Sequence, residues 1–535
     1  MKLKSRGGDL AGMVAAWARR RTTRRVLLWS VMPVVLWACA SLPPQVAHEP
    51  VAALARPSDT GLGALAASAA EPHAGRSGFM VLDTGHEAFL QRARLIEAAE
   101  RSVDAQYYIW NSDRSGHYLA CRLYAAAERG VRVRLILDDM NILGRDAVIA
   151  ALDRHPNVAV RIFNPNSNRG GFGKWLAFGA EFQRLNRRMH NKSFTVDAAF
   201  GIVGGRNIGD EYFDLHPAAN FRDRDVLAAG PIVERISANF DAYWNTELSY
   251  PVGLLAPATE GAEDDGAAIR QACVAAEEAI RLALGPVPAA DEARVLVERA
   301  LAGMTWAEAE LVFDPPASGR ETGSDEPGLT ALALQALVDE TREEILVESA
   351  YFILGDEQLE RLTRLRTEGI RVAALTNSLA SNDLTTNHSG YARRRKAMLA
   401  AGLELFELRP DAEACVVWIQ GRDDCGPAAV SLHSKSAVFD RRVVYIGSFN
   451  INLRSMYLNS ETVLLIHSRE LAGQVAEAIE LAMAPANSWR VTKGSRGGIA
   501  WSGRDGERWT HEPVTGYWHR VRASLFRLVP MEKYL

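Results

Sequence analysis

A chain of 535 residues is too long for one ordinary hydrophobic core, so its length predicts two or more domains. Its composition, 48% hydrophobic and 24% charged, is that of a globular protein. The net charge of −4 excludes an overall basic field of the kind that marks many nucleic-acid-binding proteins. Any affinity for phosphate must therefore be local.

The first 40 residues predict an export signal or a membrane anchor. Several arginines precede an apolar run at 26–40, which is short for a membrane span but suits the core of a secretory signal. The run includes Leu36-Trp37-Ala38-Cys39, which resembles a bacterial lipoprotein cleavage box with Cys39 as the acylated residue, although Trp37 departs from that pattern. The alternative is an uncleaved anchor. Both interpretations place the protein at a membrane of the bacterial cell envelope, on the periplasmic face.

Residues 41–75 are rich in alanine and proline and predict a flexible tether. Beyond it, the segment at 102–110 predicts a buried strand, 118–130 a helix that ends at a glycine, and 131–137 a second strand. A strand, a helix and a strand in this order predict a right-handed crossover in a largely parallel sheet.

The same order returns after residue 340, where strands at 344–352 and 370–376 flank a helix at 357–369. The chain therefore predicts two similar α/β domains, at 76–255 and 326–490. We expect a connector at 256–325 and a C-terminal amphipathic tail at 491–535. In the tail, 517–529 predicts a helix with an apolar face, which either lies on a membrane surface or packs onto the domain.

The chain contains five cysteines. With Cys39 assigned to a lipid, we expect Cys415 and Cys425 either to form a disulfide before the second motif, described next, or to remain free buried thiols.

Two copies of one motif dominate the sequence. Residues 190–207 read HNKSFTVDAAFGIVGGRN and residues 433–450 read HSKSAVFDRRVVYIGSFN. They align without a gap, and each has His-x-Lys, an aspartate, a glycine and an asparagine in the same register. One copy alone would be weak evidence, but two copies in register are a specific signal.

This duplication resembles the HKD motif of the phospholipase D superfamily. Three further segments resemble bacterial cardiolipin synthases, and in particular the branch called cardiolipin synthase C: residues 184–213, 348–356 and 376–401. The resemblance implies an α/β fold of two phospholipase D-like domains related by a pseudo-twofold axis, with one active site at their interface.

The motif residues suit attack on a phosphodiester. Six of them make up the catalytic set of the signature: His190, Lys192, Asp197, His433, Lys435 and Asp440. The lysines would neutralise the phosphate, and Asn207, Asn450 and Ser448 would donate hydrogen bonds to its oxygens. One histidine attacks phosphorus while the other protonates the leaving alkoxide, since an imidazole works in either protonation state.

Each histidine needs a partner that fixes its orientation. The resemblance implies acidic residues downstream of the asparagines, here Asp225 and Glu461. The motif aspartates, Asp197 and Asp440, either take part in the reaction or brace the strand and turn that carry the motif. Protonated lysine has no lone pair to donate to a metal, so we expect no metal site. We also expect no cofactor.

The resemblance implies a phosphatidyltransferase that makes cardiolipin from phosphatidylglycerol and a phosphatidyl donor, phosphatidylglycerol or phosphatidylethanolamine, through a phosphohistidine, with His190 favoured as the nucleophile. If water is the acceptor, the protein is a phospholipase D that makes phosphatidic acid. A nuclease and a non-catalytic membrane protein are weaker alternatives. Membrane phospholipids are the expected partners and nucleic acid is not; the sequence does not identify a protein partner.

Overall fold

The computed structural model describes eleven segments of the chain, residues 42–44, 49–142, 146–169, 173–255, 265–286, 288–316, 326–420, 426, 430–494, 497–527 and 532–534. The predicted signal or anchor, with Cys39, lies outside them. The chain divides into two units: Met1–Pro44 with Asn166–Phe182, and Gln45–Pro165 with Gln183–Leu535. Helix α6 (Gly173–Ala180) belongs to the first unit, and every element described below belongs to the second.

The first half of the second unit is built on three parallel strands, as predicted. They are β2 (Ser102–Tyr107), β3 (Arg132–Asp138) and β4 (Val158–Phe163). Helix α4 (Arg114–Glu128) forms the first crossover; Asp113 caps its N-terminus, and Gly130 follows its end at φ +95°. Antiparallel neighbours extend the sheet on both sides: β9 (Ser249–Pro251), β5 (Ser193–Val196), β6 (Phe200–Gly204), β8 (Asp225–Ala229) and β1 (Ser77–Leu82).

The second half repeats this arrangement. Its parallel strands are β11 (Glu344–Ser349), β12 (Arg371–Asn377) and β13 (Glu404–Leu408), with α13 (Asp356–Thr367) and α14 (Thr385–Ala401) as crossover helices. Its antiparallel strands are β15 (Lys435–Phe439), β16 (Val443–Gly447) and β17 (Thr462–His467). The predicted fold class, two α/β halves with the same strand order, is confirmed.

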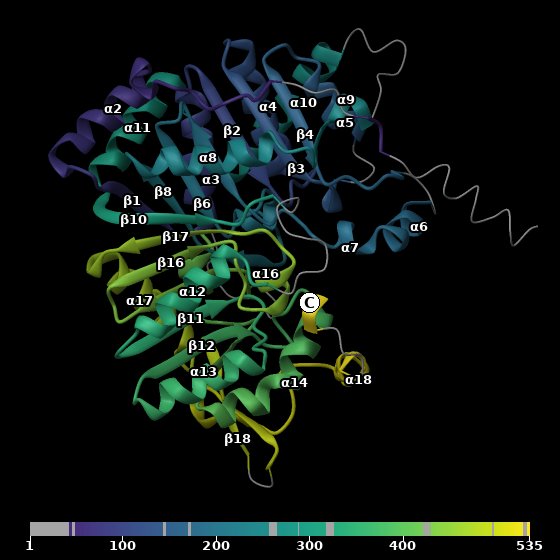
Figure 1. The fold of residues 1–535 in the computed structure, drawn as a ribbon, viewed down its shortest axis with the longest axis vertical. Coiled ribbons are helices and arrows are strands. Elements are labelled where there is room, and N and C mark those ends of the chain that lie inside the picture. The colour runs from purple at the N-terminus through teal and green to yellow at the C-terminus, as the bar shows by residue number, and fades with distance from the viewer. Residues whose placement is uncertain are drawn as a thin grey trace, which may run out of the picture. The chain divides into compact units, whose positions relative to one another are not determined.

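The two halves share one sheet. Strand β10 (Thr305–Phe313) pairs through its first residues with β1 and through the rest with β17 (Figure 1). One buried apolar cluster includes Phe79 and Val226 of the first half and Leu346 and Leu464 of the second. Residues 256–325 were predicted as a connector with helices of its own, but this segment also contains β10, which completes the sheet and brings the halves together.

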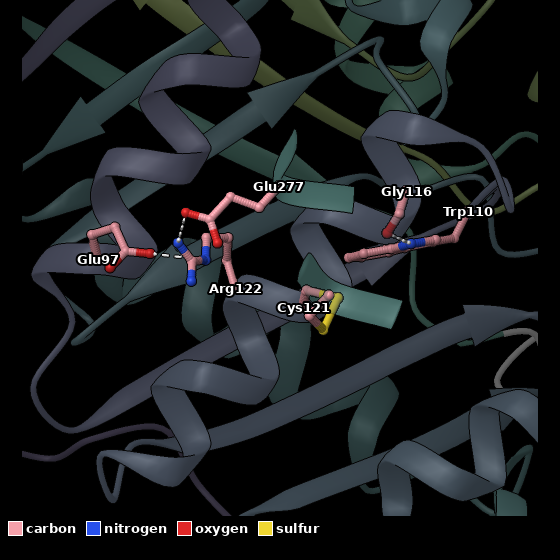
Figure 2. Close-up of a disulfide and its surroundings, with 7 residues drawn as sticks. Glu97, Trp110, Gly116, Cys121, Arg122 and Glu277 are labelled. Atoms are coloured by element: carbon pink, nitrogen blue, oxygen red, sulfur yellow. Dashed lines mark hydrogen bonds and ion pairs between the residues drawn. A yellow bond between two sulfur atoms is a disulfide. The ribbon is translucent and has the colours of Figure 1, made fainter. Parts of the chain in front are cut away.

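Two helices of the predicted connector cover the first half. Helix α11 (Ala290–Ala302) packs on α3 (Gly85–Ala98), and α10 (Asp265–Leu284) packs on α4. A disulfide between Cys121 of α4 and Cys273 of α10 fastens the second pair. Beside it, the guanidinium of Arg122 lies between the carboxylates of Glu97 and Glu277, at 3.2 and 3.9 Å (Figure 2).

Two other boundary predictions need correction. Part of the predicted tether forms helix α2 (Gly61–Ala70), whose Leu62 and Ala66 are buried in the core of the first half. The first part of the tail continues the sheet, through β18 (Ser488–Lys493), β19 (Ile499–Ser502) and β20 (Arg508–Trp509). The amphipathic segment itself is helix α18 (Tyr517–Phe526). Within the described segments, none of the helices has the length and apolar character needed to cross a membrane.

Candidate active site

Both His-x-Lys pairs lie at the start of equivalent strands. His190 and Lys192 lead into β5, and His433 and Lys435 lead into β15. All four residues are buried. Pairs of alternate residues share one face of an extended chain, so each histidine and its lysine point in the same direction.

His190 is held by a residue of the other half. Its Nδ1 atom lies 2.8 Å from a carboxylate oxygen of Glu461. The backbone supports this contact, because the amide of His190 donates to the carbonyl of Ser460, at 2.9 Å. Glu461 was predicted as a histidine-orienting residue, and the geometry agrees.

His433 is held in the same way from the first half, but by a residue that was not predicted. Its Nδ1 atom lies 2.6 Å from a carboxylate oxygen of Asp223. Strand β14 (Val430–Leu432) pairs with β7 (Asn220–Arg222) immediately before these two residues, so the backbone brings them together. The prediction of Asp225 for this role is wrong.

The strand register explains the error. Gly204 of β6 is paired with Asp225, and its counterpart Gly447 of β16 is paired with Val463. Asp223 and Glu461 each lie two residues before those positions, so they are counterparts in the two halves. The segment from Asn207 to Asp223 is longer than the segment from Asn450 to Glu461, so the two acids cannot be matched by counting residues. Asp223 and Asp225 are close together in the sequence, and only the strand register distinguishes them.

Asp225 has a structural role. Its carboxylate accepts from the guanidinium of Arg92, at 2.9 Å, and from the backbone amide of Arg206, at 3.1 Å. Arg92 is also fully buried and donates to the hydroxyl of Tyr107. The aspartate therefore provides the counter-charge for a buried arginine of α3.

The acid–histidine contacts leave Nε2 of each ring as the nitrogen that can meet a substrate. Burial lowers the pKa of His190 to about 4, against the opposing effect of Glu461. Burial and the charge of Lys435 lower the pKa of His433 to about 4. Without a bound anion, both rings are therefore neutral at pH 7.

Burial also lowers the pKa of both lysines, that of Lys192 to about 7. Lys435 lowers the pKa of Lys192 and of both histidines, and Lys192 lowers that of His190, so the four groups are close enough to disfavour one another's protonation. The ammonium of Lys192 donates to the carbonyl of His190, at 2.5 Å, and Lys435 donates likewise to His433. A phosphate in this site would offset the unfavourable burial of positive charge.

The motif aspartates brace the fold and do not face the histidines. The carboxylate of Asp197 accepts from the backbone amides of residues 100–102, at 2.8 to 3.0 Å. Asp440 does the same for the amides of residues 342–344. Both lie in the hairpin turns between paired strands, at φ 51° and 49°, a conformation that aspartate tolerates. Of the two alternatives for these residues, the structure supports the bracing role over the catalytic one.

Ser448 was predicted to bind phosphate, but the structure places its hydroxyl on Glu461, at 2.5 Å. It also accepts from the amide of Thr462. Its counterpart Gly205 leaves no space for a side chain, because a Cβ there would lie 2.1 Å from a carboxylate oxygen of Asp223. Ser448 therefore orients the acid that holds His190.

The two motif asparagines differ. Asn207 accepts from the amide of Ile109, at 3.1 Å, and donates to the hydroxyl of Tyr212, at 3.0 Å. Asn450 is also buried, and its side-chain oxygen has no hydrogen-bond partner among the residues that the structure describes. Contact of either residue with phosphate stays a prediction.

Aromatic rings surround the histidines, and the sequence analysis did not find them. The ring of Tyr108 packs edge-on against His190, at 5.1 Å between centroids, and the rings of Tyr212 and Phe221 each lie 5.0 Å from His433. Tyr351 and Asp383 form a further pair, with 2.8 Å between the hydroxyl and the nearer carboxylate oxygen. The charge of Asp383 acts on both His433 and Lys435.

The cysteine prediction is only partly resolved. Cys415 takes part in a disulfide, but Cys425 lies outside the described residues, so their pairing stays a prediction. The disulfide between Cys121 and Cys273 was not predicted. Among the described residues, no group of three or more histidine, cysteine or acidic side chains could hold a metal ion.

Comparison with known proteins identifies the family. The family model described as cardiolipin synthase, PLD-like domain, matches residues 93–244 and 334–482. Cardiolipin synthase C from Escherichia coli strain K12 is 38% identical over 86% of this chain and 96% of its own length. Cardiolipin synthase A from Pseudomonas syringae pv. syringae strain B728a is 25% identical over 74% of this chain and 66% of its own length.

A solved structure shows the same fold. Phosphatidylserine synthase from Haemophilus influenzae Rd KW20 superposes with a TM-score of 0.54 at 13% identity, covering 88% of this chain and 100% of the synthase chain. The duplicated motif, the matched family model and the 38% identical relative agree. The chain belongs to the PLD-like cardiolipin synthase family.

Proposed function

We propose that this protein makes cardiolipin by transferring a phosphatidyl group to the free hydroxyl of phosphatidylglycerol. The donor is phosphatidylglycerol or phosphatidylethanolamine. The observation that carries the proposal is the reciprocal pairing of His190 with Glu461 and of His433 with Asp223, with a buried lysine beside each histidine. The 38% identity to a cardiolipin synthase over most of both chains supports phospholipid as the substrate.

In the first step, Nε2 of His190 attacks the phosphorus of the donor. A nitrogen–phosphorus bond forms, the bond from phosphorus to the departing oxygen breaks, and His433 gives that oxygen its proton. Binding of the anionic phosphate raises the pKa of His433, because it offsets the charge of Lys435, and so supplies the protonated imidazolium. The leaving group is glycerol or ethanolamine.

In the second step, neutral His433 removes the proton from the acceptor hydroxyl. The acceptor oxygen attacks phosphorus and the bond to His190 breaks, which restores the enzyme. Lys192 and Lys435 stabilise the charge on the phosphoryl oxygens in both steps. Assignment of His190 as the nucleophile is a prediction, since the two pairs are related by pseudo-symmetry.

Hydrolysis to phosphatidic acid is the second candidate, since water could replace the acceptor hydroxyl in the same site. The identity to cardiolipin synthases favours transfer. We also propose that the protein acts at the periplasmic face of the cell envelope, anchored through its first 40 residues. The disulfide between Cys121 and Cys273 supports an oxidising compartment.

The test is thin-layer chromatography of lipids after incubation of the purified protein with labelled phosphatidylglycerol and, separately, with phosphatidylethanolamine plus phosphatidylglycerol. The control is the double variant His190→Ala, His433→Ala. Labelled cardiolipin that is absent from the control supports the proposal and identifies the donor. Phosphatidic acid alone would make the protein a hydrolase, and turnover of neither lipid would contradict both candidates.

A second experiment assigns the histidines. Each single alanine variant is incubated with lipid labelled in its phosphate and then quenched with acid-free denaturant. Label retained on the His433→Ala protein and absent from the His190→Ala protein supports His190 as nucleophile. The opposite distribution would reverse the assignment.

A further inference from the structure

Exposed apolar side chains gather in one short C-terminal region. Tyr517, Trp518 and Leu525 of α18 are 65%, 79% and 61% exposed. Of the large apolar side chains exposed in the described segments, six lie between residues 514 and 534. Scattered single residues of this kind are normal on a protein surface, but a group that includes tryptophan and tyrosine indicates an interaction surface.

Helix α18 is firmly held by its other side. Ala523 is buried, and its carbonyl accepts from the hydroxyl of Ser389 on α14, at 2.9 Å. At the solvent-exposed edge of this contact, Arg522 donates to the hydroxyl of Thr385, also on α14, at 3.1 Å. The helix therefore packs on the domain, which is one of the two alternatives predicted for residues 517–529. It still exposes Trp518 and Leu525 to solvent.

One loop residue beside this surface acts electrostatically on the candidate active site. Leu384 is 46% exposed and precedes the first residue of α14, against which α18 packs. Its neighbour Asp383 accepts from the hydroxyl of Tyr351, and its charge acts on His433 and Lys435. A single loop therefore joins the exposed apolar residues to the catalytic groups.

Helix α18 carries two arginines next to these apolar residues. Arg520 donates to the carbonyl and hydroxyl of Thr515, and Arg522 to a threonine hydroxyl. Within the described part of the chain neither arginine forms an ion pair with a carboxylate. Aromatic side chains combined with arginine match the interface of an anionic phospholipid bilayer, where the rings enter the headgroup region.

We propose that the outer face of α18, with Leu384, docks on an anionic phospholipid membrane. Trp518 and Leu525 insert among the headgroups, and Arg520 and Arg522 attract anionic lipid. The inference rests on the proposed function in one respect, namely that the substrate lies in a bilayer. The surface itself can be tested without turnover.

The test uses the full chain in vesicles of phosphatidylcholine and phosphatidylglycerol. The double variant Trp518→Ser, Leu525→Ser is compared with Val274→Ser, Leu282→Ser, which removes two side chains that are 70% and 73% exposed on α10. Each protein is assayed on bilayer phosphatidylglycerol and on short-chain phosphatidylglycerol dissolved as monomers. Replacing half of the phosphatidylcholine by its acyl-brominated form then measures the quenching of tryptophan fluorescence.

We expect the α18 variant to lose at least about tenfold of its rate on vesicles, because two large apolar side chains no longer enter the bilayer. Its rate on monomeric substrate and the rates of the α10 variant should remain those of the parent. Brominated lipid should quench the parent, and Trp518→Phe alone should lose that part of the quenching. Arg522→Glu should weaken the vesicle rate most at low salt.

Equal vesicle rates and equal quenching for the parent and the α18 variant would overturn the proposal. Absence of the Trp518 contribution to quenching in the parent would also overturn it and would indicate that a protein covers this face. If the parent converts neither substrate, the proposed function fails, while the quenching still decides whether α18 docks on the membrane.

Discussion

The Nδ1 atom of His190 lies 2.8 Å from Glu461, although the two residues belong to opposite halves of the protein. The reciprocal contact joins His433 to Asp223. Each half therefore supplies the histidine of one pair and the carboxylate of the other. Neither half alone contains an oriented histidine, which gives a physical reason for the duplication beyond the need for two imidazoles.

A buried ionic contact joins the two halves next to these histidine–carboxylate pairs. Arg222 and Arg224 of the first half both bind the carboxylate of Glu348 in the second. Ser434 and Ser436 also donate to that carboxylate, at 2.8 and 2.7 Å. The charges of the arginines lower the pKa of Glu348 to about 2, despite its burial. This contact holds in place the segments that carry Asp223 and His433.

Asp223→Asn should mainly lower the catalytic rate, whereas Asp225→Asn should mainly lower stability. Loss of the Asp223 charge should lower kcat by about 10²–10⁴-fold with little change in fold, because the His433 ring loses the group that orients it. Asp225→Asn should lower the free energy of unfolding by about 3–5 kcal/mol, because Arg92 is left buried without its counter-charge. Kinetics and chemical denaturation of both variants check this. A greater loss of kcat per folded molecule in Asp225→Asn would restore Asp225 as the histidine partner.

Lys192→Met should stabilise the protein while abolishing its activity. The pKa of Lys192 lies near 7 in the fold and at 10.5 in the unfolded chain, so the unfolded chain binds more protons between these values. Stability linked to Lys192 is therefore lost as the pH falls toward 7. The methionine variant should be more stable than the parent by about 1–3 kcal/mol at pH 6, and the difference should shrink toward pH 10.5. Denaturation curves across this range provide the measurement; a variant that is less stable at pH 6 would contradict the expectation.

Acidification should destabilise the protein partly through the two histidines. Their pKa values are about 4 in the fold and 6.5 when unperturbed, so between these values the unfolded chain binds more protons than the folded protein. Stability is thus present above pH 6.5 and lost as the pH falls toward 4. The double variant His190→Gln, His433→Gln should lose less stability over this range. Parallel losses in parent and variant would show that other groups cause the acid sensitivity.

The motif aspartates should affect stability more than chemistry. Asp197→Ala leaves three backbone amides at residues 100–102 without their acceptor, and Asp440→Ala does the same at residues 342–344. Each change should lower the free energy of unfolding by about 1–3 kcal/mol. The rate per folded molecule should stay within about threefold of the parent, in contrast to the large loss expected for a catalytic acid. Active-site titration of the folded fraction separates the two effects.

Removal of the disulfide between α4 and α10 should lower stability without changing catalysis. Cys121→Ser with Cys273→Ser should cost about 2–4 kcal/mol of stability, because the bond links positions 152 residues apart. The kinetic constants should be unchanged, since α4 and α10 lie outside the histidine pairs. Addition of a reducing agent to the parent should cause at least this loss, because it also reduces the disulfide of Cys415. An unaffected melting temperature in the variant would indicate that the helices pack without help from the bond.

The sequence by itself determined the local features of this protein. Motif spacing placed each His-x-Lys pair on one face of a strand, and hydrophobic patterns predicted the parallel strands and crossover helices of each half. These features depend on residues close together in the chain. The predicted tether over 41–75 shows the limit: α2 is rich in alanine and small residues, and only packing against α11 makes it part of the core.

Only the tertiary structure decided which distant groups meet. The choice of Asp223 over Asp225 follows from hairpin register, and the choice of partner histidine follows from the exchange between the halves. Strand β10 became the junction because its two ends pair with strands of different halves. Apart from the β6–β8 register, these contacts join residues more than a hundred positions apart. Spacing along the chain carries little information about which of such distant residues come together.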